Sequence, residues 1–374
     1  MAELIFDADT LKILQQYGFD PVVFEGLRAR ITTDKPKSSE NHVQGAIRAP
    51  SAGDVVDLPP LGTPERERLT AAGNAAIAAG EVAMVVLAGG MATRFGGVVK
   101  ATVPAIGDQT FLQLKLADAE AAATRAGGSV PILFMTSFAT DAEIRNAISA
   151  EPASASRPTD TFAQHISARL TPEGDLFLDA AGNPSLHATG HGDLPSALRR
   201  SGALGRLREA GVKQLVMSNV DNLTATLDPA LIAMHREAKV SMSVENAPKV
   251  PGDAGGAPAF VDDVLQIVEG FRFPPSFDQE TIPVFNTNTL IFETEALDQD
   301  FDFTWFTVTK KVEGNPVIQF ERLVGELSAL MPSAFFRVQR EGADARFQPV
   351  KDPAELEARQ TEIAAVLRAR GILS

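Results

Sequence analysis

The sequence has no cysteine among its 374 residues. That absence excludes disulfides, catalysis by a thiolate and a structural zinc site built from cysteines. Basic residues are few relative to acidic ones, because 34 Lys and Arg face 48 Asp and Glu and leave a formal net charge of −14. A chain this acidic is poorly suited to nucleic acid, whose recognition needs a positive surface. It can still bind a small phosphate ligand, because a few local cations can oppose the net charge.

Long apolar runs are missing too. No stretch approaches the roughly 18 apolar residues that a membrane span needs. The N-terminal sequence, M-A-E-L-I-F-D-A-D, carries acidic residues where a signal peptide carries basic ones. Four of the histidines, His42, His165, His187 and His235, have no spacing typical of metal ligands. We therefore expect a cytoplasmic protein whose partners include neither a membrane nor a nucleic acid.

The most informative stretch lies between residues 82 and 100. Val82 to Ala88 is a short apolar run bounded by glycines, which predicts a strand buried on both faces of a parallel α/β sheet. The loop that follows contains two pairs of adjacent glycines, Arg94 and Lys100. Glycines let a backbone approach a ligand closely, and the two cations suit phosphate oxygens. A strand that ends in such a loop indicates a phosphate-binding site at the carboxyl edge of a sheet.

Two common phosphate loops do not fit this stretch. A Walker loop, G-x-x-x-x-G-K-[ST], cannot be aligned with it. The dinucleotide fingerprint G-x-G-x-x-G is excluded because Gly89 and Gly90 are adjacent and residue 91 is Met, which argues against a nicotinamide dehydrogenase. A plain glycine-rich turn is the remaining alternative, but such a turn has no need of Arg94 and Lys100.

Helical and strand patterns alternate along much of the chain, which predicts a doubly wound, mostly parallel α/β sheet. The expected helices span residues 9–17, 63–79, 110–126, 141–150, 194–210 and 352–370. The expected strands span residues 82–88, 130–136, 214–219 and 335–338, with shorter strands within 161–178 and 239–292. We expect an N-terminal helical appendage at 1–75 with an irregular connection at 35–60, a catalytic domain at 76–330 and a short C-terminal segment at 331–374.

Two further sites carry polar residues at the ends of predicted elements. The strand at 214–219 leads into Asp221, which would place an oxygen ligand for Mg²⁺ beside the phosphate loop. An Asp-Asn turn that only ends the strand would look the same. The sequence Gly190-His191-Gly192-Asp193 predicts a tight turn in which the backbone closely approaches another group and Asp193 caps the next helix. A lone histidine is often structural, but the flanking glycines favour ligand contact for His191.

Eight short motifs occur in a characteristic order along the chain. They are L-A-G-G-M-A-T-R-F-G-G (87–97), M-T-S-F-A-T-D (135–141), F-A-Q (162–164), G-H-G-D (190–193), S-N-V-D-N-L (218–223), F-N-T-N (285–288), V-I-Q-F-E (317–321) and R-F-Q-P-V-K (346–351). Together they resemble the eukaryotic-type UTP–glucose-1-phosphate uridylyltransferases and their UDP-N-acetylhexosamine pyrophosphorylase relatives. The resemblance covers roughly residues 65–355 and implies a Rossmann-like, GT-A-like nucleotidyltransferase fold.

The resemblance implies a nucleotide site. The residues expected around the uracil and the ribose are Leu87, Ala88, Gly89 and Gly90, with Gln164 at the uracil edge. By the same resemblance, Arg94 and Lys100 would hold the phosphates of UTP. Gly190 and His191 would line the boundary between the nucleotide and the sugar.

The resemblance also implies a metal and sugar site. Asn219 and Asp221 would bind the product or its Mg²⁺, the one cofactor that we expect. The residues that fall where relatives hydrogen-bond sugar hydroxyls are Glu269, Asn286 and Asn288. Lys351 would contact the sugar phosphate, and Lys311 or its neighbour Lys310 would be a further phosphate contact.

The implied reaction joins UTP and a sugar-1-phosphate to form a UDP-sugar and pyrophosphate. Glucose-1-phosphate is favoured because G-H-G-D and S-N-V-D-N-L look like the glucose branch of the family. The lead-in to the core strand looks more like the other branch and keeps N-acetylglucosamine-1-phosphate, or a broad range of sugar-1-phosphates, as the alternative. A non-catalytic sugar-nucleotide-binding protein is the alternative from another class, and the retained Arg94, Lys100, Asp221 and Lys351 argue against it.

The chain departs from the family pattern in three places. Ala92 stands where the family usually has Gly, and Val99 stands where Pro is usual, so the register of Lys100 is less fixed than that of Arg94. Only 23 residues follow Lys351, and they have the pattern of one helix. Relatives of the glucose branch carry an assembling β-helix in that place, so we expect a monomer or a weak dimer.

Overall fold

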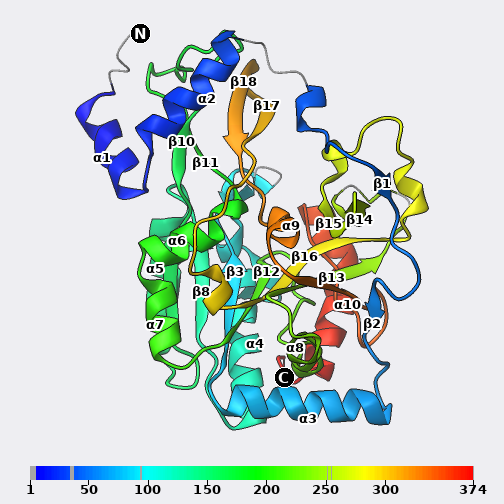
Figure 1. Cartoon of the computed structure of the whole chain (residues 1–374). Helices are drawn as coiled ribbons and strands as arrows, with labels where there is room; N and C mark the ends of the chain where they lie inside the picture. The colour runs from blue at the N-terminus through cyan, green and yellow to red at the C-terminus, as the bar shows by residue number, and fades with distance from the viewer. Residues whose placement is uncertain (1–5, 34–37, 93–94, 251, 254, 374) are drawn as a thin grey trace.

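A computed structural model describes residues 6–33, 38–92, 95–250, 252–253 and 255–373. At its centre is an eight-stranded sheet (Figure 1). In spatial order its strands are β2 (Val56–Asp57), β19 (Ser333–Arg337), β13 (Met242–Pro248), β16 (Val284–Glu293), β12 (Gln214–Asn219), β3 (Val82–Leu87), β8 (Ile132–Thr136) and β9 (Thr159–Ala163). Neighbouring strands are parallel except at β16, which is antiparallel to both β12 and β13. The mostly parallel sheet expected from the sequence is therefore confirmed.

Helices cover both faces of this sheet. Val82, Met84 and Val86 of β3 belong to a core cluster with residues of α3 (Pro64–Ala78), α4 (Phe111–Ala126), α8 (Pro229–Ala238) and α10 (Pro353–Ala369). Ala83 and Val85 belong to the opposite cluster, with residues of α6 (Leu194–Arg200) and α7 (Ala203–Glu209). Successive side chains of a strand point to opposite faces. Because both faces of β3 are covered, every position in it is apolar, which explains the unbroken apolar run in the sequence.

Several helices begin and end where the sequence places caps. Thr63 accepts a hydrogen bond from the backbone N–H of Arg66 at the start of α3. Thr110 and Gln113 form a capping box at the start of α4, each side chain accepting from the other residue's backbone N–H. Gly127 ends α4 in the left-handed conformation, with φ of 71°. These contacts are local in sequence, so the sequence predicts them well.

The helix expected over residues 194–210 is instead two helices, α6 and α7. Gly202 separates them with φ of 71°, a conformation that glycine adopts readily and that ends an α-helix. Observed features outside the elements that the sequence predicts include α2 (Pro21–Thr33), α8, and a hairpin of β17 (Phe306–Val312) and β18 (Asn315–Glu321).

The N-terminal part is joined to the rest of the fold through both packing and strand pairing. The helices α1 (Ala8–Gln16) and α2 (Pro21–Thr33) pack near the β17–β18 hairpin and β10 (Ile166–Ala168) (Figure 1). Within 35–60, expected to be irregular, β1 (Ile47–Arg48) pairs with β14 (Ala257–Val261), and β2 forms one edge of the central sheet. The C-terminal part contributes β19 to that sheet. Segments on both sides of the boundaries expected near 75 and 330 thus belong to one sheet. An edge strand such as β2 can pair with whatever backbone lies alongside it.

The remaining elements are short. They are α5 (Asp141–Ala150), α9 (Leu327–Leu330), β4 (Met91–Ala92), β5 (Val98–Val99), β6 (Pro104–Ile106), β7 (Gln109–Thr110), β11 (Leu186–Ala188), β15 (Val264–Val268) and the 3₁₀ helices η1 (Ser38–Asn41), η3 (Lys100–Thr102), η4 (His191–Asp193), η5 (Gly270–Arg272), η6 (Gln279–Thr281), η7 (Glu295–Leu297) and η8 (Val324–Glu326). Across the described ranges, each helix is too short or too polar to cross a membrane.

A buried ion pair fixes the C-terminal arm, residues 346–351, to the core. The side chain of Arg346 is 1% exposed, and its Nε and Nη2 donate to the two carboxylate oxygens of Glu245 at 2.6 and 2.7 Å. Its Nη2 also donates to the carbonyl of Thr226 at 2.9 Å. Burial raises the pKa of Glu245, and the Arg346 charge opposes that rise. The arm is therefore held by a buried charge pair. Loss of either partner would leave the other charge buried and unpaired, with a large desolvation penalty.

We predict that Arg346→Met lowers the free energy of unfolding by about 3–5 kcal/mol, because it leaves Glu245 buried without its partner. The matched control is Arg337→Met. Arg337 also contacts both oxygens of an aspartate, Asp57, but these side chains are 48% and 60% exposed. Its loss should cost at most about 1 kcal/mol. Urea unfolding of the two variants measures both values, and equal losses would contradict the assignment.

Candidate active site

A cavity of about 580 Å³ opens at the carboxyl edge of β3 and β12. These strands are parallel and adjacent, with Leu87 paired to Asn219, so the loops that follow them leave the sheet side by side. The cavity is lined by ten of the residues predicted from the sequence: Leu87, Gly89, Gly90, Lys100, Gln164, Gly190, His191, Asn219, Asp221 and Lys351. The other lining residues are Met91, Ala188, Val220 and Glu321.

Gly89 leaves room for the close approach of the Gln164 side chain. A Cβ atom at position 89 would lie 2.7 Å from the side-chain nitrogen of Gln164, nearer than real Cβ atoms come to any neighbour. The Gly89 carbonyl also accepts a hydrogen bond from the Ser137 hydroxyl at 2.7 Å. Gln164 is buried, and its backbone N–H donates to the carbonyl of Thr136 at the end of β8. The first glycine thus lets the end of β3 and the Gln164 amide form one wall of the cavity.

Three segments that are far apart in sequence meet at Lys100. Its ammonium lies 2.8 Å from the Asp221 carboxylate and also donates to the carbonyl of Val350. The backbone N–H of Val350 donates to the carbonyl of Asp221 at 3.0 Å. The glycine loop, the loop after β12 and the C-terminal arm are therefore joined directly. The next residue of the arm, the exposed Lys351, lines the same cavity.

A resident metal site made only of protein groups is absent from the part of the chain that the structure describes, where no three His, Cys, Asp or Glu side chains form a metal-binding group. Mg²⁺ differs from most metals in that it commonly uses one or two carboxylates and takes its other ligands from phosphates and water. Asp221, with a side chain 25% exposed at the cavity, fits that pattern. The donor set suits a Mg²⁺ ion that arrives with a nucleotide.

His191 presents a neutral N–H donor. Its Nδ1 accepts a hydrogen bond from the backbone N–H of Val324 at 3.0 Å, so the ring proton resides on Nε2. Burial lowers the pKa of His191, which keeps the ring uncharged near neutral pH.

The glycines that flank His191 serve a protein contact. A Cβ at Gly190 would lie 2.4 Å from the carbonyl oxygen of Arg322, and one at Gly192 would lie 2.5 Å from the carbonyl carbon. The turn therefore packs closely against the chain just after β18, which is the kind of close approach that the glycines predict, while Gly190 and His191 also line the cavity. Asp193 is fully buried and does not cap α6 with its side chain. It accepts hydrogen bonds from the backbone of His165, the hydroxyl of Thr189 and the guanidinium of Arg322.

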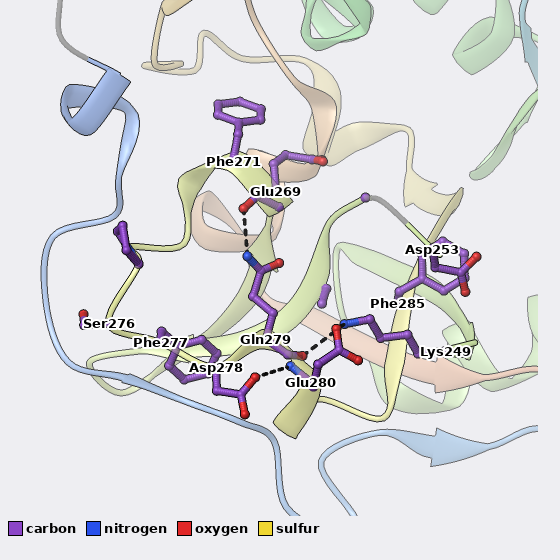
Figure 2. Close-up of a pocket in the computed structure, with 14 residues that line it drawn as sticks. Lys249, Asp253, Glu269, Phe271, Ser276, Phe277, Asp278, Gln279, Glu280 and Phe285 are labelled. Atoms are coloured by element: carbon purple, nitrogen blue, oxygen red, sulfur yellow. Dashed lines mark hydrogen bonds and ion pairs between the residues drawn. The ribbon is translucent and has the colours of Figure 1, made fainter. Parts of the chain in front are cut away.

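The predicted sugar-contacting residues lie at and beside a second cavity, of about 830 Å³ (Figure 2). Glu269 lines it, and burial raises the pKa of this carboxyl. Asn286 and Asn288 line neither cavity, but they connect the two regions. The Asn286 side chain accepts from the backbone of Asn288, whose amide donates to Asn219 at 2.9 Å. Asn288 has φ of 58°, an uncommon conformation for a residue other than glycine and one that is often found near functional sites.

Neither Lys310 nor Lys311 is among the residues that line the cavity, but the two differ in their distance from a lining residue. The ammonium of Lys310 lies 3.8 Å from the carboxylate of Glu321, a cavity-lining residue. Side chains alternate along β17, so Lys311 points to the other face of the hairpin. Lys311, named from the sequence as a catalytic candidate, therefore stays a prediction, with Lys310 as its alternative.

Three further residues concern the site: Ala88, Arg94 and Glu321. Ala88 is buried in the core and does not line the cavity. Arg94 lies outside the described residues. Glu321 is a lining residue that the sequence reasoning passed over, although it ends the V-I-Q-F-E motif, directly after four buried residues of β18.

The fold and the cavity define an α/β protein of the nucleotide-binding class, with a glycine loop and an acidic strand end at one edge of a mostly parallel sheet. The family follows from comparison with known protein families. Residues 23–367 match the model of the UTP–glucose-1-phosphate uridylyltransferase family. The chain belongs to this family.

Individual relatives agree with that assignment. The chain is 28% identical over 299 residues to the UTP–glucose-1-phosphate uridylyltransferase of Solanum tuberosum and 25% identical over 289 residues to that of Encephalitozoon cuniculi. Each alignment covers 74% of this chain, but only 60% and 57% of the respective relative. The chain thus spans less than two thirds of the length of these relatives.

Solved structures share the fold at low sequence identity. The UDP-N-acetylglucosamine pyrophosphorylase of Trypanosoma brucei has a TM-score of 0.70 and 18% identity, covering 99% of this chain and 85% of its own. A mutant UDP-glucose pyrophosphorylase from Leishmania major, solved in complex with UDP-glucose, has a TM-score of 0.71 and 20% identity, covering 92% and 77%. These likenesses confirm the nucleotidyltransferase fold.

We predict that His191 stays in the neutral Nε2–H form when the pH falls to about 6.5, where an ordinary histidine is half protonated. The cause is its burial, together with the hydrogen bond from Val324 to Nδ1. Imidazole ¹⁵N chemical shifts followed over pH measure this directly, with His191→Gln as the control that assigns the signal. A protonation midpoint near that ordinary value, or a proton on Nδ1, would contradict it.

Proposed function

We propose that the protein transfers the uridylyl group of UTP to glucose-1-phosphate and releases pyrophosphate, with UDP-glucose as the product. The observation that carries this proposal is the meeting of the glycine loop, Asp221 and Lys351 at one cavity. Family membership supports it independently, since the matching relatives are named for this activity.

The chemistry needs no covalent step on the protein. The phosphate oxygen of the sugar-1-phosphate is already anionic, so no general base has to remove a proton from it. It attacks the α-phosphorus of UTP in line, a new P–O bond forms, the bond to the β-phosphate oxygen breaks, and pyrophosphate leaves. The protein's task is then to position two anions and to stabilise the charge that develops between them.

The residues around the cavity have the properties that this task requires. Lys100 and Lys351 supply two cations from different segments, which suits one for UTP and the other for the sugar phosphate. Neutral His191 can donate to a phosphate oxygen without adding charge. Gly89 and Gln164 offer a close-packed wall for a flat base.

We propose Mg²⁺ as the cofactor, held by Asp221 together with phosphate oxygens. A bound Mg²⁺ ion would neutralise negative charge on the phosphates. The ion pair with Lys100 orients the Asp221 carboxylate at the cavity before any ligand arrives.

The sugar is proposed as glucose because the matching curated relatives carry that substrate in their names. N-acetylglucosamine-1-phosphate is the second candidate, and the fold likeness to a UDP-N-acetylglucosamine pyrophosphorylase favours keeping it. The monomer or weak dimer and the cytoplasmic location expected from the sequence stay predictions.

We predict Mg²⁺-dependent release of pyrophosphate from UTP and glucose-1-phosphate by the purified protein. The test is a panel of UTP with glucose-, galactose- and N-acetylglucosamine-1-phosphate, each with Mg²⁺ and with a chelator. Glucose-1-phosphate should give the highest kcat/KM. A folded sample that releases no pyrophosphate with any of these sugars would overturn the proposal, and a preference for the N-acetylated sugar would favour the second candidate.

We predict that Lys351→Ala slows the chemical step by about 10²- to 10³-fold, the scale of removing one donor to a transition state. The affinity for UTP should change little, because the glycine loop and Gln164 come from other segments. Single-turnover rates measure the first quantity and calorimetry the second. Lys12→Ala, an exposed lysine on α1, is the matched control. Weakened UTP binding with normal turnover would show that Lys351 contacts UTP and not the sugar phosphate, which would contradict the prediction.

A further inference from the structure

Lys115 is a fully buried cation that the proposed chemistry does not use. It lies in α4, and the whole residue is 1% exposed. Its ammonium donates three hydrogen bonds: to the hydroxyl of Ser218 at 3.1 Å, the carbonyl of Asn222 at 2.8 Å and the carbonyl of Ala225 at 3.0 Å. An ammonium has three N–H donors, and each finds an acceptor here.

All three acceptors lie at the end of β12 or in the connection that follows it. Ser218 precedes Asn219 and Asp221, and Asn222 and Ala225 follow them, so the ammonium holds the chain on both sides of the cavity residues. The loop has turned back on itself at this point, and its carbonyls face the core. Buried carbonyls need donors, and here Lys115 of α4, which does not line the cavity, supplies them.

The same loop also holds the C-terminal arm. The side chain of Asn222 donates to the carbonyl of Arg346 at 3.0 Å and accepts from the backbone N–H of Gln348 at 3.1 Å. The carbonyl of Asp221 accepts from the backbone N–H of Val350 at 3.0 Å. The position of Lys351 is therefore set by a loop whose own position is set by Lys115.

The charge environment is compatible with an ammonium. Burial lowers the pKa of Lys115 to about 8, while the nearby carboxylate of Asp118 acts against that shift. At pH 7 the charged form still predominates. Burying a charge costs free energy. Retaining the charge is explained when it fixes a conformation that apolar groups cannot specify.

We propose that Lys115 is a positioning residue for uridylyl transfer. It fixes the 218–225 loop so that Asp221 and, through Asn222, Lys351 stand in register at the reacting phosphates. This inference rests on the proposed function. Its consequence is selective: the chemical step depends on Lys115, whereas UTP binding through the glycine loop and Gln164 does not.

The test replaces Lys115 with Met, which keeps most of the volume and removes the charge. We expect kcat to fall about 10²-fold, the effect of displacing reacting groups by roughly an ångström, with KM for UTP changed less than about threefold. His235→Gln is the matched control. His235 in α8 is also fully buried, but it contacts Ser243 and Glu293, and Glu293 pairs with Gln214 at the start of β12, the end away from the cavity. Loss of His235 should lower the melting temperature and leave kcat within about threefold of the wild type.

Ser218→Ala is a milder variant in case Lys115→Met does not fold. It removes one of the three acceptors and leaves the ammonium in place. A smaller fall in kcat, at unchanged KM for UTP, is expected. A normal kcat in Lys115→Met, or a fall in kcat in His235→Gln as large as that in Lys115→Met, would overturn the proposal. If Lys115→Met does not fold, a normal kcat in Ser218→Ala would overturn the proposal.

Amide hydrogen exchange gives a second readout that needs no catalysis. In Lys115→Met, or in Ser218→Ala to a smaller degree, we expect faster exchange within residues 219–225 and 346–351, and unchanged exchange in β3 and β8. Faster exchange throughout the sheet would reduce Lys115 to a general stabilising role and overturn the proposal. If the wild-type protein releases no pyrophosphate, the proposed function fails, while the exchange pattern still decides whether Lys115 positions the loop and the arm.

Discussion

In the parallel pairing of β3 with β12, Leu87 lies opposite Asn219, and both strands end at the same edge of the sheet. Each strand is also paired on its other side, β3 with β8 and β12 with β16, so neither can shift without breaking two sets of hydrogen bonds. The glycine loop and the Asp221 loop are thereby fixed relative to each other. The Lys100–Asp221 pair and the wall formed by Gly89 and Gln164 are consequences of this arrangement.

The C-terminal arm adds the third component of the site at a considerable electrostatic cost. Arg346 and Glu245 are both buried, and burying two charges outweighs their attraction unless the geometry is good and other hydrogen bonds are made. Here the contact joins two atoms of each partner, and Thr226 accepts a further bond. A pair of this kind is more informative about specificity than about stability. It allows one docking position for the arm, and that position delivers Lys351 to the cavity.

The cavity does not share the strong negative charge of the whole chain, because among its described lining residues two lysines balance Asp221 and Glu321. The protein carries a formal charge of −14, yet Lys100 and Lys351 converge on a single cavity. Their mutual repulsion is reduced because Asp221 pairs with one of them. His191, held neutral by burial, adds a donor without adding charge. An acidic protein can accept a triphosphate in this way because local charges at short range dominate over the net charge, which salt screens.

The sequence alone determined the parts of this protein that depend on neighbouring residues. Apolar runs predicted β3, β8 and β12, the caps at Thr63 and Thr110 predicted α3 and α4, and the order of the motifs predicted most of the residues that line the cavity. The tertiary structure alone decided which lysine of β17 pairs with Glu321, why Gly190 and Gly192 are glycines, and what Asp193 and Lys115 contact. The physical reason is the range of the interactions. Caps and periodic patterns act within a few residues, whereas most of these contacts join segments about 100 residues apart or more, whose meeting is set by the pairing order of the sheet.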